Sequence, residues 1–237
     1  HAEAWGIGAN ELLDRLPTLV GLDDPIWNGT TPTEIRDLDA ESHGLRLGAN
    51  GAMHETLVKA VLGQMVTTQE AKRSFRLLKS TFGAPAPGPF TTVKAFPDPS
   101  VIAGMSYEDL HRVGVEQKRA EIVIEASRRA RRINESLTMP VADAWNRLLA
   151  IRGVGPWTAG MVMGPAYGDR DAVPIGDYHL ANTIGWALGA QPRSDDARML
   201  ELLEPFRPYR RRILMMVKQA GIRAPKYGPR TAMRSHL

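Results

Sequence analysis

Apolar residues recur at helical spacing along most of this chain. The clearest run begins at His54 and places its apolar residues three or four positions apart: Leu57, Val58, Val61, Leu62 and Met65. This spacing is typical of a helix with one buried face. Thr67 and Glu70 then match the capping-box pattern, in which a hydroxyl and a carboxylate satisfy the first amides of a helix. We therefore predict a helix pair over residues 54–83.

Further helices are predicted downstream. Ser106 and Asp109 form a second capping-box pattern. Amphipathic spacing predicts helices over 116–133, 142–149, 194–203 and 210–219. The Pro-rich stretch 84–99 is predicted to be a loop. No segment alternates as a strand would, so the predicted fold is all-α, with two helical lobes and an active-site cleft between them.

The chain divides into three predicted regions. Residues 1–50 are predicted to form a short helix over the apolar segment 11–22, which Asn10 is placed to cap, and then a long irregular connection. Because the chain starts at His1 rather than Met, this region is a candidate remnant of an upstream domain. Residues 51–220 form the helical core, and residues 221–237 form a basic tail.

Composition excludes several kinds of site. The 237 residues include no Cys, so disulfides, thiolate zinc sites and a cysteine-held iron–sulfur cluster are impossible. Apolar runs are much shorter than a bilayer span and nothing resembles a signal peptide. We expect a monomeric cytoplasmic protein with no membrane contact and no cofactor.

The formal net charge is only +4, but the basic residues are clustered. From Pro205 to the end there are nine Lys or Arg and no Asp or Glu: Arg207, Arg210, Arg211, Arg212, Lys218, Arg223, Lys226, Arg230 and Arg234. A second cluster lies on the helix predicted over 116–133: Lys118, Arg119, Arg128, Arg129, Arg131 and Arg132. Such asymmetry suits a polyanionic partner. Solvated helix faces and a basic tail are the alternative interpretation.

A glycine hairpin lies between two predicted helices. Gly153 and Gly155 flank Val154, and Pro156 suits the first turn of the helix that follows. Backbone amides at a glycine turn and a helix N-terminus form an anion site, so a phosphate group is the expected ligand.

The hairpin, and an aspartate twenty residues after Trp157, resemble the helix-hairpin-helix DNA glycosylases, most closely the DNA-3-methyladenine glycosylase II family. The resemblance implies that Asp177 is the catalytic residue. It also implies that the hairpin binds the DNA backbone through Gly153, Val154, Gly155 and Thr158, with Lys118 and Arg119 as further backbone contacts. The helix pair over 54–83 would carry the DNA wedge, Met65, with Gln64 beside it. Packing of Met65 at a helix end is the alternative.

The chemistry expected of Asp177 is electrostatic. Breaking an N-glycosidic bond develops positive charge on the deoxyribose, so a carboxylate beside the sugar lowers the barrier and can orient or deprotonate the attacking water. An alkylated purine is already cationic and needs little protonation to leave, which agrees with the lack of a second recognisable acid. The alternative role for Asp177 is the N-cap of the helix that follows.

The resemblance also bears on Trp157 and Tyr178. Family members that cut the strand carry a Schiff-base lysine at the position of Trp157, so a tryptophan there implies a monofunctional enzyme that leaves an abasic site. Trp157 and Tyr178 would line the base pocket, where aromatic faces favour a cationic base. Core packing is the alternative for Trp157. Lys218 stands where the best-known members have a pocket tryptophan, which leaves the base specificity open.

Two further possibilities follow from the resemblance. The backbone carbonyls of Leu149, Ile151 and Gly153 are candidates for holding a monovalent cation. The partner would be double-stranded DNA containing damaged bases. Competing interpretations are a glycosylase with another specificity, such as hypoxanthine or uracil, and a non-catalytic DNA-binding module.

Overall fold

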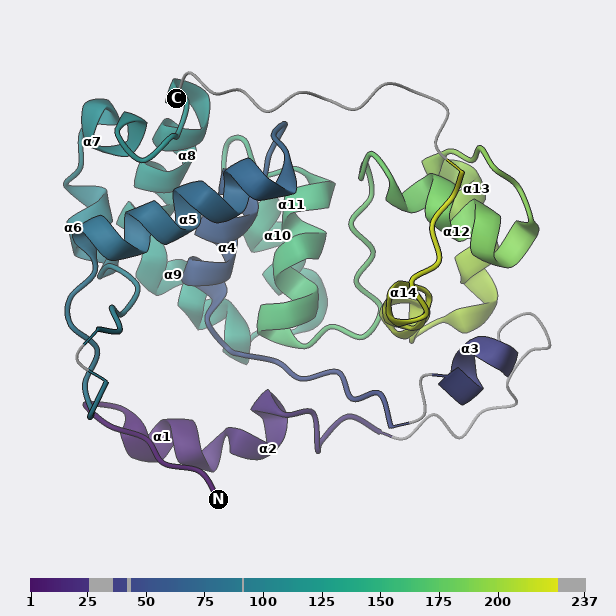
Figure 1. Ribbon diagram of the computed structural model, residues 1–237, viewed down its shortest axis with the longest axis horizontal. Coiled ribbons are helices and arrows are strands. Elements are labelled where there is room, and N and C mark those ends of the chain that lie inside the picture. The colour runs from purple at the N-terminus through teal and green to yellow at the C-terminus, as the bar shows by residue number, and fades with distance from the viewer. Residues whose placement is uncertain (26–35, 42–43, 91, 226–237) are drawn as a thin grey trace.

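A computed structural model describes residues 1–25, 36–41, 44–90 and 92–225, and within these residues the fold is all-α (Figure 1). The nearest approach to a strand in the described chain is an isolated bridge between Pro85 and Lys94 in the Pro-rich loop. Two separate clusters of buried side chains confirm the two helical lobes that the sequence predicts. Figure 1 shows them side by side.

The first lobe contains the helix pair, the hairpin and a short π-helix. Its helices are α4 (Met53–Leu62), α5 (Thr68–Phe82), α6 (Pro99–Ala103), α7 (Tyr107–His111), α8 (Gln117–Arg128), α9 (Ala130–Asn134), η2 (Glu135–Thr138), α10 (Val141–Leu149), α11 (Pro156–Val162) and η3 (Met163–Tyr167). Helix α4 lies at its centre, with eight of ten residues buried. Burial of the side chains in this core supplies most of the lobe's stability, because apolar area removed from water is the main favourable term in folding.

The second lobe is smaller. It contains α3 (Arg36–Glu41), α12 (Leu180–Gly189), α13 (Asp196–Leu203), η4 (Glu204–Phe206) and α14 (Arg210–Gln219). Leu38 of α3 belongs to the same buried cluster as Ile184 of α12 and Ile213 of α14. Within the described residues, two segments that connect the lobes are residues 44–52 and residues 168–179, called here the first and second crossing segments (Figure 1).

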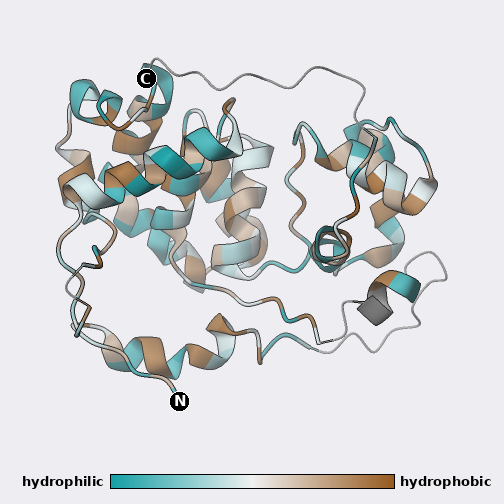
Figure 2. Ribbon diagram, in the orientation of Figure 1, coloured by the Kyte–Doolittle hydropathy of each residue, from teal (hydrophilic) through white to brown (hydrophobic). Residues whose placement is uncertain are grey.

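The N-terminal helices lie along the outside of the first lobe (Figure 1). They are α1 (Ala9–Asp14) and α2 (Leu16–Leu19), and neither buries a residue. Their apolar side chains, including Leu12 and Leu19, stay exposed, and Figure 2 marks the hydrophobic positions of these helices in brown. The short helix predicted over 11–22 forms as two helices that meet at Arg15, and its predicted cap is wrong, because the cap residue of α1 is Gly8 and Asn10 lies inside the helix.

Both predicted capping boxes form. Thr67 Oγ1 accepts from the Glu70 amide while Glu70 accepts from the Thr67 amide, and Ser106 and Asp109 bond in the same way. The long helix predicted over 116–133 breaks at Arg129, which ends α8 with φ −104° and ψ 10°. Residues 226–237, which include three of the nine C-terminal basic residues, lie outside the described structure.

Candidate active site and DNA interface

The glycine hairpin joins α10 to α11 as the sequence predicts, and its two glycines differ in backbone conformation and in the space around them. Gly153 has φ +85°, and a Cβ there would lie 2.4 Å from Cδ1 of Ile122. Gly155 is extended, with φ −98°, and a Cβ there would meet nothing within 4 Å. Gly153 is therefore required by the turn itself, whereas Gly155 leaves an open approach to the backbone.

The start of α11 presents unpaired backbone donors. Pro156 occupies its first turn, so the next amides are those of Trp157 and Thr158, for which helical geometry supplies no partner. Val154 is buried, and its amide bonds the Ile151 carbonyl at 2.9 Å. The side chain of Val154 thus anchors the turn, and phosphate binding by the surrounding amides stays a prediction.

Asp177 lies on the second crossing segment, which packs against α11 at a point without a side chain. A Cβ on Gly160 would lie 2.7 Å from Cα of Pro174. Oδ1 of Asp177 accepts hydrogen bonds from the amides of His179 (2.9 Å) and Leu180 (3.0 Å). The carboxylate therefore binds two backbone amides at the start of α12, although the N-cap residue of that helix is His179 and not Asp177.

The other carboxylate oxygen is held by the hairpin. Nε1 of Trp157 donates to Oδ2 of Asp177 at 2.9 Å. Three donors from three residues thus orient one half-buried carboxylate, and hydrogen bonds to a charged acceptor are stronger than neutral ones. From the sequence, only the spacing between Trp157 and Asp177 indicated that they belong to one site, and nothing predicted this hydrogen bond.

Tyr178 is exposed. Its side chain is 86% accessible, and its ring meets the ring of His179 edge-on, with centroids 4.7 Å apart. It lies directly beside Asp177 in the chain, and whether it stacks on a base stays a prediction.

The turn between α4 and α5 presents Met65 to solvent. Its side chain is 97% exposed, and its backbone has φ +55°, a left-handed conformation that is unusual for a residue other than glycine. Because an exposed side chain packs against nothing, the alternative interpretation of Met65 as helix-end packing is wrong. Gln64 points inward, and its Nε2 donates to the Gly153 carbonyl (3.0 Å) and to Oγ1 of Thr158 (2.8 Å).

Two predicted backbone contacts have buried side chains. Thr158 is 2% exposed, so its side chain does not contact DNA. Arg119 is 5% exposed, and its Nη1 donates to the Leu62 carbonyl at 2.9 Å. The assignment of Arg119 to DNA binding is therefore wrong, because its guanidinium serves the end of α4. Lys118, its neighbour, is exposed.

The other basic residues around α8 and α9 are partly neutralised. Arg128 and Arg129 pair with Glu125, and Arg131 pairs with Glu135. The two residues of each pair lie three or four positions apart on a helix surface, and each such pair contributes little to stability. They reduce the positive field that the sequence predicts for this helix.

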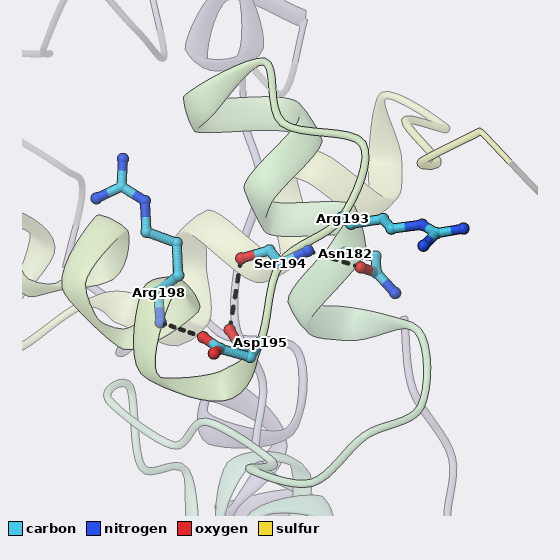
Figure 3. A pocket seen from close by; sticks show the side chains of 5 residues that line it. All are labelled: Asn182, Arg193, Ser194, Asp195 and Arg198. Carbon is cyan, nitrogen blue, oxygen red and sulfur yellow. Dashed lines mark hydrogen bonds between the residues drawn. The ribbon is translucent and has the colours of Figure 1, made fainter.

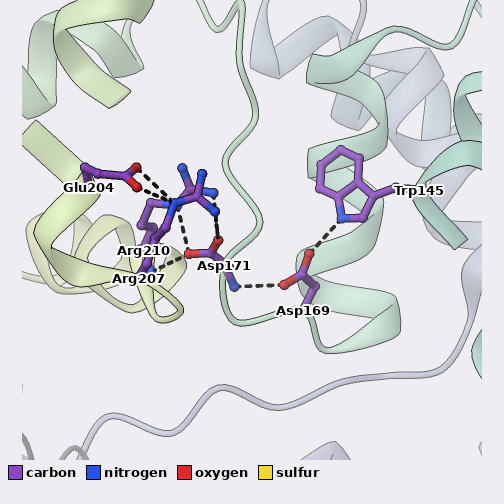
Figure 4. A network of polar contacts seen from close by, with 6 residues as sticks. All are labelled: Trp145, Asp169, Asp171, Glu204, Arg207 and Arg210. Atoms are coloured by element: carbon purple, nitrogen blue, oxygen red, sulfur yellow. Dashed lines mark hydrogen bonds and ion pairs between the residues drawn. The ribbon is translucent and has the colours of Figure 1, made fainter. Parts of the chain in front are cut away.

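The C-terminal arginines are structural. Arg210 binds Asp171 with two parallel bonds, from Nε (2.8 Å) and Nη2 (2.7 Å), and Arg207 pairs with Asp171 and Glu204. Figure 4 shows this network around the second crossing segment, continued from Asp169 to Trp145. Arg207 and Arg210 therefore do not form a basic surface that is free to bind a polyanion, because carboxylates pair with both.

The remaining arginines of the run 210–212 lie partly or fully inside the protein, since Arg211 is half-buried and Arg212 is buried. Arg212 forms an ion pair with Asp24, and both side chains are at least 95% buried. Burial lowers the pKa of Arg211 below its usual value, with Asp169 and Asp24 acting in the opposite direction. The expectation that residues 210–212 contribute surface attraction to DNA is therefore wrong.

A shallow cavity of about 560 Å³ lies in the second lobe, and no predicted site residue is among those that line it (Figure 3). It is lined by Asn182, Arg193, Ser194, Asp195 and Arg198. Its lining residues bond within the fold: Asn182 accepts from the Ser194 amide, Asp195 caps α13, and Arg198 donates to Gln191 and pairs with Glu201. The polar residues that line the cavity therefore serve to join α12 to α13.

Two of the three carbonyls proposed for a cation already accept hydrogen bonds. Ile151 accepts from Val154, and Gly153 accepts from Gln64. A carbonyl oxygen has two lone pairs, so the cation site stays a prediction. In the described residues, no group of three His, Asp or Glu could hold a metal ion. No helix in the described part of the chain is long and apolar enough to cross a membrane.

Comparisons with known proteins agree with this geometry. Residues 58–208 match the family described as HhH-GPD superfamily base excision DNA repair protein. The protein YfjP of Bacillus subtilis (strain 168), which carries the name of a DNA-3-methyladenine glycosylase, is 27% identical over 183 residues, or 75% of this chain. The chain spans 62% of the length of YfjP.

Two further comparisons extend over more of the chain. DNA-3-methyladenine glycosylase 2 of Escherichia coli (strain K12) is 28% identical over 205 residues, which are 85% of this chain and 70% of that protein. The solved structure of a 3-methyladenine DNA glycosylase from Archaeoglobus fulgidus superposes with a TM-score of 0.75 at 19% identity. That superposition covers 89% of this chain and 74% of the other, and shows a shared fold.

Proposed function

Because the chain belongs to the HhH-GPD superfamily of base excision DNA repair proteins, we propose that it is a monofunctional DNA glycosylase that removes alkylated purines, such as 3-methyladenine, from double-stranded DNA. The observation that carries this proposal is the Asp177 carboxylate, which three hydrogen bonds hold beside the hairpin. Similarity of the chain to proteins named as 3-methyladenine glycosylases supports the choice of substrate.

Asp177 acts on the sugar rather than on the base. As the bond between C1′ and the base nitrogen breaks, the base leaves with the bonding electrons and positive charge grows on the deoxyribose. A fixed carboxylate stabilises that charge without having to reorganise at the moment of reaction. Water then adds to C1′, and Asp177 orients it or takes its proton, which leaves an abasic site.

The proposed preference for alkylated purines rests on the leaving group and on the aromatic neighbours. A cationic purine departs readily, and the described site holds no second carboxylate bonded to Asp177. Tyr178 is exposed beside the carboxylate and is available to stack on an extruded base. Trp157 presents an aromatic face that attracts a cation.

The absence of lyase activity is proposed from Trp157. A Schiff base requires an amine, and the residue that contacts Asp177 from the hairpin carries an indole instead. Borohydride trapping tests this directly: no covalent adduct with DNA is expected. An adduct that survives denaturation would identify another amine as the nucleophile.

DNA binding is proposed to use three parts of the first lobe. The amides around Gly155 receive one phosphate, Met65 enters the base stack, and exposed Lys118 contacts the backbone. An apolar side chain inserted between bases keeps the duplex open after a base has left. Loss of the Lys118 contact should reduce the salt slope of log K by roughly one unit.

The deciding experiment uses duplexes that each carry a single 3-methyladenine, hypoxanthine or uracil, with alkali to reveal abasic sites. Wild-type protein should release 3-methyladenine. Asp177→Asn keeps the shape and loses the charge, so the single-turnover rate should fall on the order of a hundredfold or more. Affinity for a duplex with an abasic site should change little.

Each other outcome has a defined meaning. Release of uracil or hypoxanthine alone would correct the substrate. Binding to all duplexes without release of any base would favour the non-catalytic DNA-binding module. An Asp177→Asn rate near that of wild type would remove Asp177 from catalysis.

A further inference from the structure

Gln64 is directed into the protein and not toward the DNA side of its turn. Its Nε2 lies 3.0 Å from the Gly153 carbonyl and 2.8 Å from Oγ1 of Thr158. Because a peptide carbonyl can only accept a hydrogen bond, the group that faces Gly153 must be the amide NH₂ and not the amide oxygen. The two protons of that NH₂ therefore bind the two sides of the hairpin, its glycine turn and the first turn of α11.

The same turn is held from a second direction. Arg119, on α8, donates to the carbonyl of Leu62, the last residue of α4. Gly63 follows directly, and a Cβ built on it would lie 3.4 Å from Cη2 of Trp157. The backbone of the turn thus lies close to the indole that donates to Asp177.

These contacts explain the backbone of Met65. A left-handed conformation costs a residue with a Cβ about 1–2 kcal/mol. Such a conformation persists only where neighbouring contacts over-determine it. Here the fixed Leu62 carbonyl precedes Met65 and the fixed Gln64 side chain adjoins it. The result is that a 97% exposed apolar side chain projects from a rigid turn.

We propose that Gln64 is a positioning residue that ties the wedge turn to the hairpin. Met65 then enters the base stack in a set register with the phosphate at the hairpin and with Asp177. This inference rests on the proposed function, because it assigns Gln64 a part in extruding the base. According to this proposal, Gln64 affects base extrusion and not general DNA affinity.

Thr158 supplies the matched control for this assignment. Its side chain is 2% exposed, so it cannot touch DNA, and its hydroxyl is one of the two acceptors of the Gln64 amide. Thr158→Val keeps the shape and the backbone amide and removes one bond. Gln64→Ala removes both. Met65→Ala serves as the reference for loss of the wedge itself.

The experiment follows base extrusion with 2-aminopurine placed beside the damaged base, together with the single-turnover rate of base release. Gln64→Ala should lower both the fluorescence change and the rate by about thirtyfold, from the loss of two hydrogen bonds of roughly 1 kcal/mol each. Thr158→Val should lower them by about threefold to fivefold on the same basis. Affinity for an undamaged duplex should stay near that of wild type, and rates are compared per folded molecule, because loss of the same bonds also lowers the thermal midpoint by a few degrees.

A double variant decides between a tie and a direct contact. If Gln64 acts through the hairpin, Gln64→Ala with Thr158→Val should be no worse than Gln64→Ala alone. Effects that multiply, or a Thr158→Val protein that extrudes the base like wild type, would overturn the proposal and leave Gln64 as a direct DNA contact. Failure of wild-type protein to release any base would refute the proposed function instead, and 2-aminopurine fluorescence would still report on Gln64.

Discussion

At the scale of single residues, Trp157 links the hairpin to the chemistry. Its Nε1–H supplies one of the three hydrogen bonds on the Asp177 carboxylate, and the only one from a side chain among those described. Trp157→Phe keeps an aromatic face and removes this donor. Hydrogen bonds to charged groups contribute about 1.5–3 kcal/mol, so the single-turnover rate should fall at least tenfold.

The chain offers a matched control for this change. Trp145 also donates through Nε1 to a carboxylate, Asp169, at 2.8 Å. Trp145→Phe therefore removes the same kind of bond at a place remote from Asp177 in the sequence. Its rate per folded molecule should equal that of wild type. Equal losses in the two variants would assign the Trp157 bond to folding and not to catalysis.

Single residues also show what the sequence could and could not predict. The position of Asp177 beside the hairpin could be predicted from its distance along the sequence. The position of Gly155 in the turn could be predicted from the glycine pattern. Arg119 does not: nothing in its basic neighbourhood indicates that it is buried and bonded to Leu62, 57 residues earlier. A charged residue is solvated by default, and only the packing of α4 against α8 reverses that expectation.

At the scale of elements, the hairpin separates folding from binding. Gly153→Ala should lower stability, because φ +85° is strained for alanine and the new Cβ would collide with Ile122. Gly155→Ala should fold like wild type, since its Cβ would meet nothing within 4 Å. Its DNA affinity should drop by roughly tenfold, because that Cβ obstructs the approach of a phosphate.

Thermal unfolding and DNA affinity, measured for both variants, test this separation. The expected pattern is a lowered midpoint for Gly153→Ala and weaker binding at an unchanged midpoint for Gly155→Ala. If Gly155→Ala bound DNA as tightly as wild type, the phosphate would have to bind elsewhere.

The packing of α4 against α8 also predicts a pH dependence. His54 is buried, and Nε2 lies 2.9 Å from Oγ of Ser127, whose own proton goes to the Val123 carbonyl. The ring must therefore donate. Burial lowers the pKa of His54 to about 4, with Asp98 opposing the shift. In the unfolded chain the pKa is 6.5, so below that pH the unfolded state binds the proton that the folded state refuses.

The sign of this effect is fixed by those two pKa values. Neutral His54 should make its full contribution to the free energy of unfolding above pH 6.5. This contribution should be lost as the pH drops toward 4, which lowers the free energy of unfolding by about 3 kcal/mol in total. Urea unfolding at pH 7, 5.5 and 4.5 measures it. His54→Gln keeps a donor for Ser127 but does not titrate, so its stability should depend less on pH. An identical pH dependence in both proteins would assign the loss to other groups.

Elements were predicted best where the chain carries local signals. Thr67 with Glu70, and Ser106 with Asp109, specify helix starts through bonds made within four residues, and both formed. The break at Arg129 carries no such signal, because neither Gly nor Pro lies there. It depends on packing of α8 and α9 against other elements, which spacing along one helix cannot report.

At the scale of the whole molecule, the sequence indicated two lobes but not what joins them. Periodicity identifies the faces that each lobe buries. The joining contacts are pairs between distant residues, such as Arg210 with Asp171 and Arg212 with Asp24, the latter 188 residues apart. A run of arginines without nearby carboxylates therefore suggested a surface for DNA, although its partners were supplied by other segments.

Asp24 is the clearest of these joining residues. Its carboxylate pairs with Arg212 of α14, lies 3.2 Å from Nε of Arg170 on the second crossing segment, and accepts from the Leu47 amide at 2.9 Å. One side chain thus connects the N-terminal region, both crossing segments and the second lobe. The region 1–25 is in this way part of the folded core, although α1 and α2 bury nothing.

Removal of Asp24 should destabilise the protein strongly, because it leaves Arg212 buried without its carboxylate. Breaking a buried pair in this way costs about 3–5 kcal/mol, against about 1 kcal/mol or less for an exposed residue. Asp23→Ala is the control, since Asp23 is exposed and bonds only Thr18 through its side chain. Urea unfolding of Asp24→Ala, Asp23→Ala and wild type measures the difference. Equal stability of the two variants would mean that the lobes are joined by apolar packing, and that the charges between them contribute little.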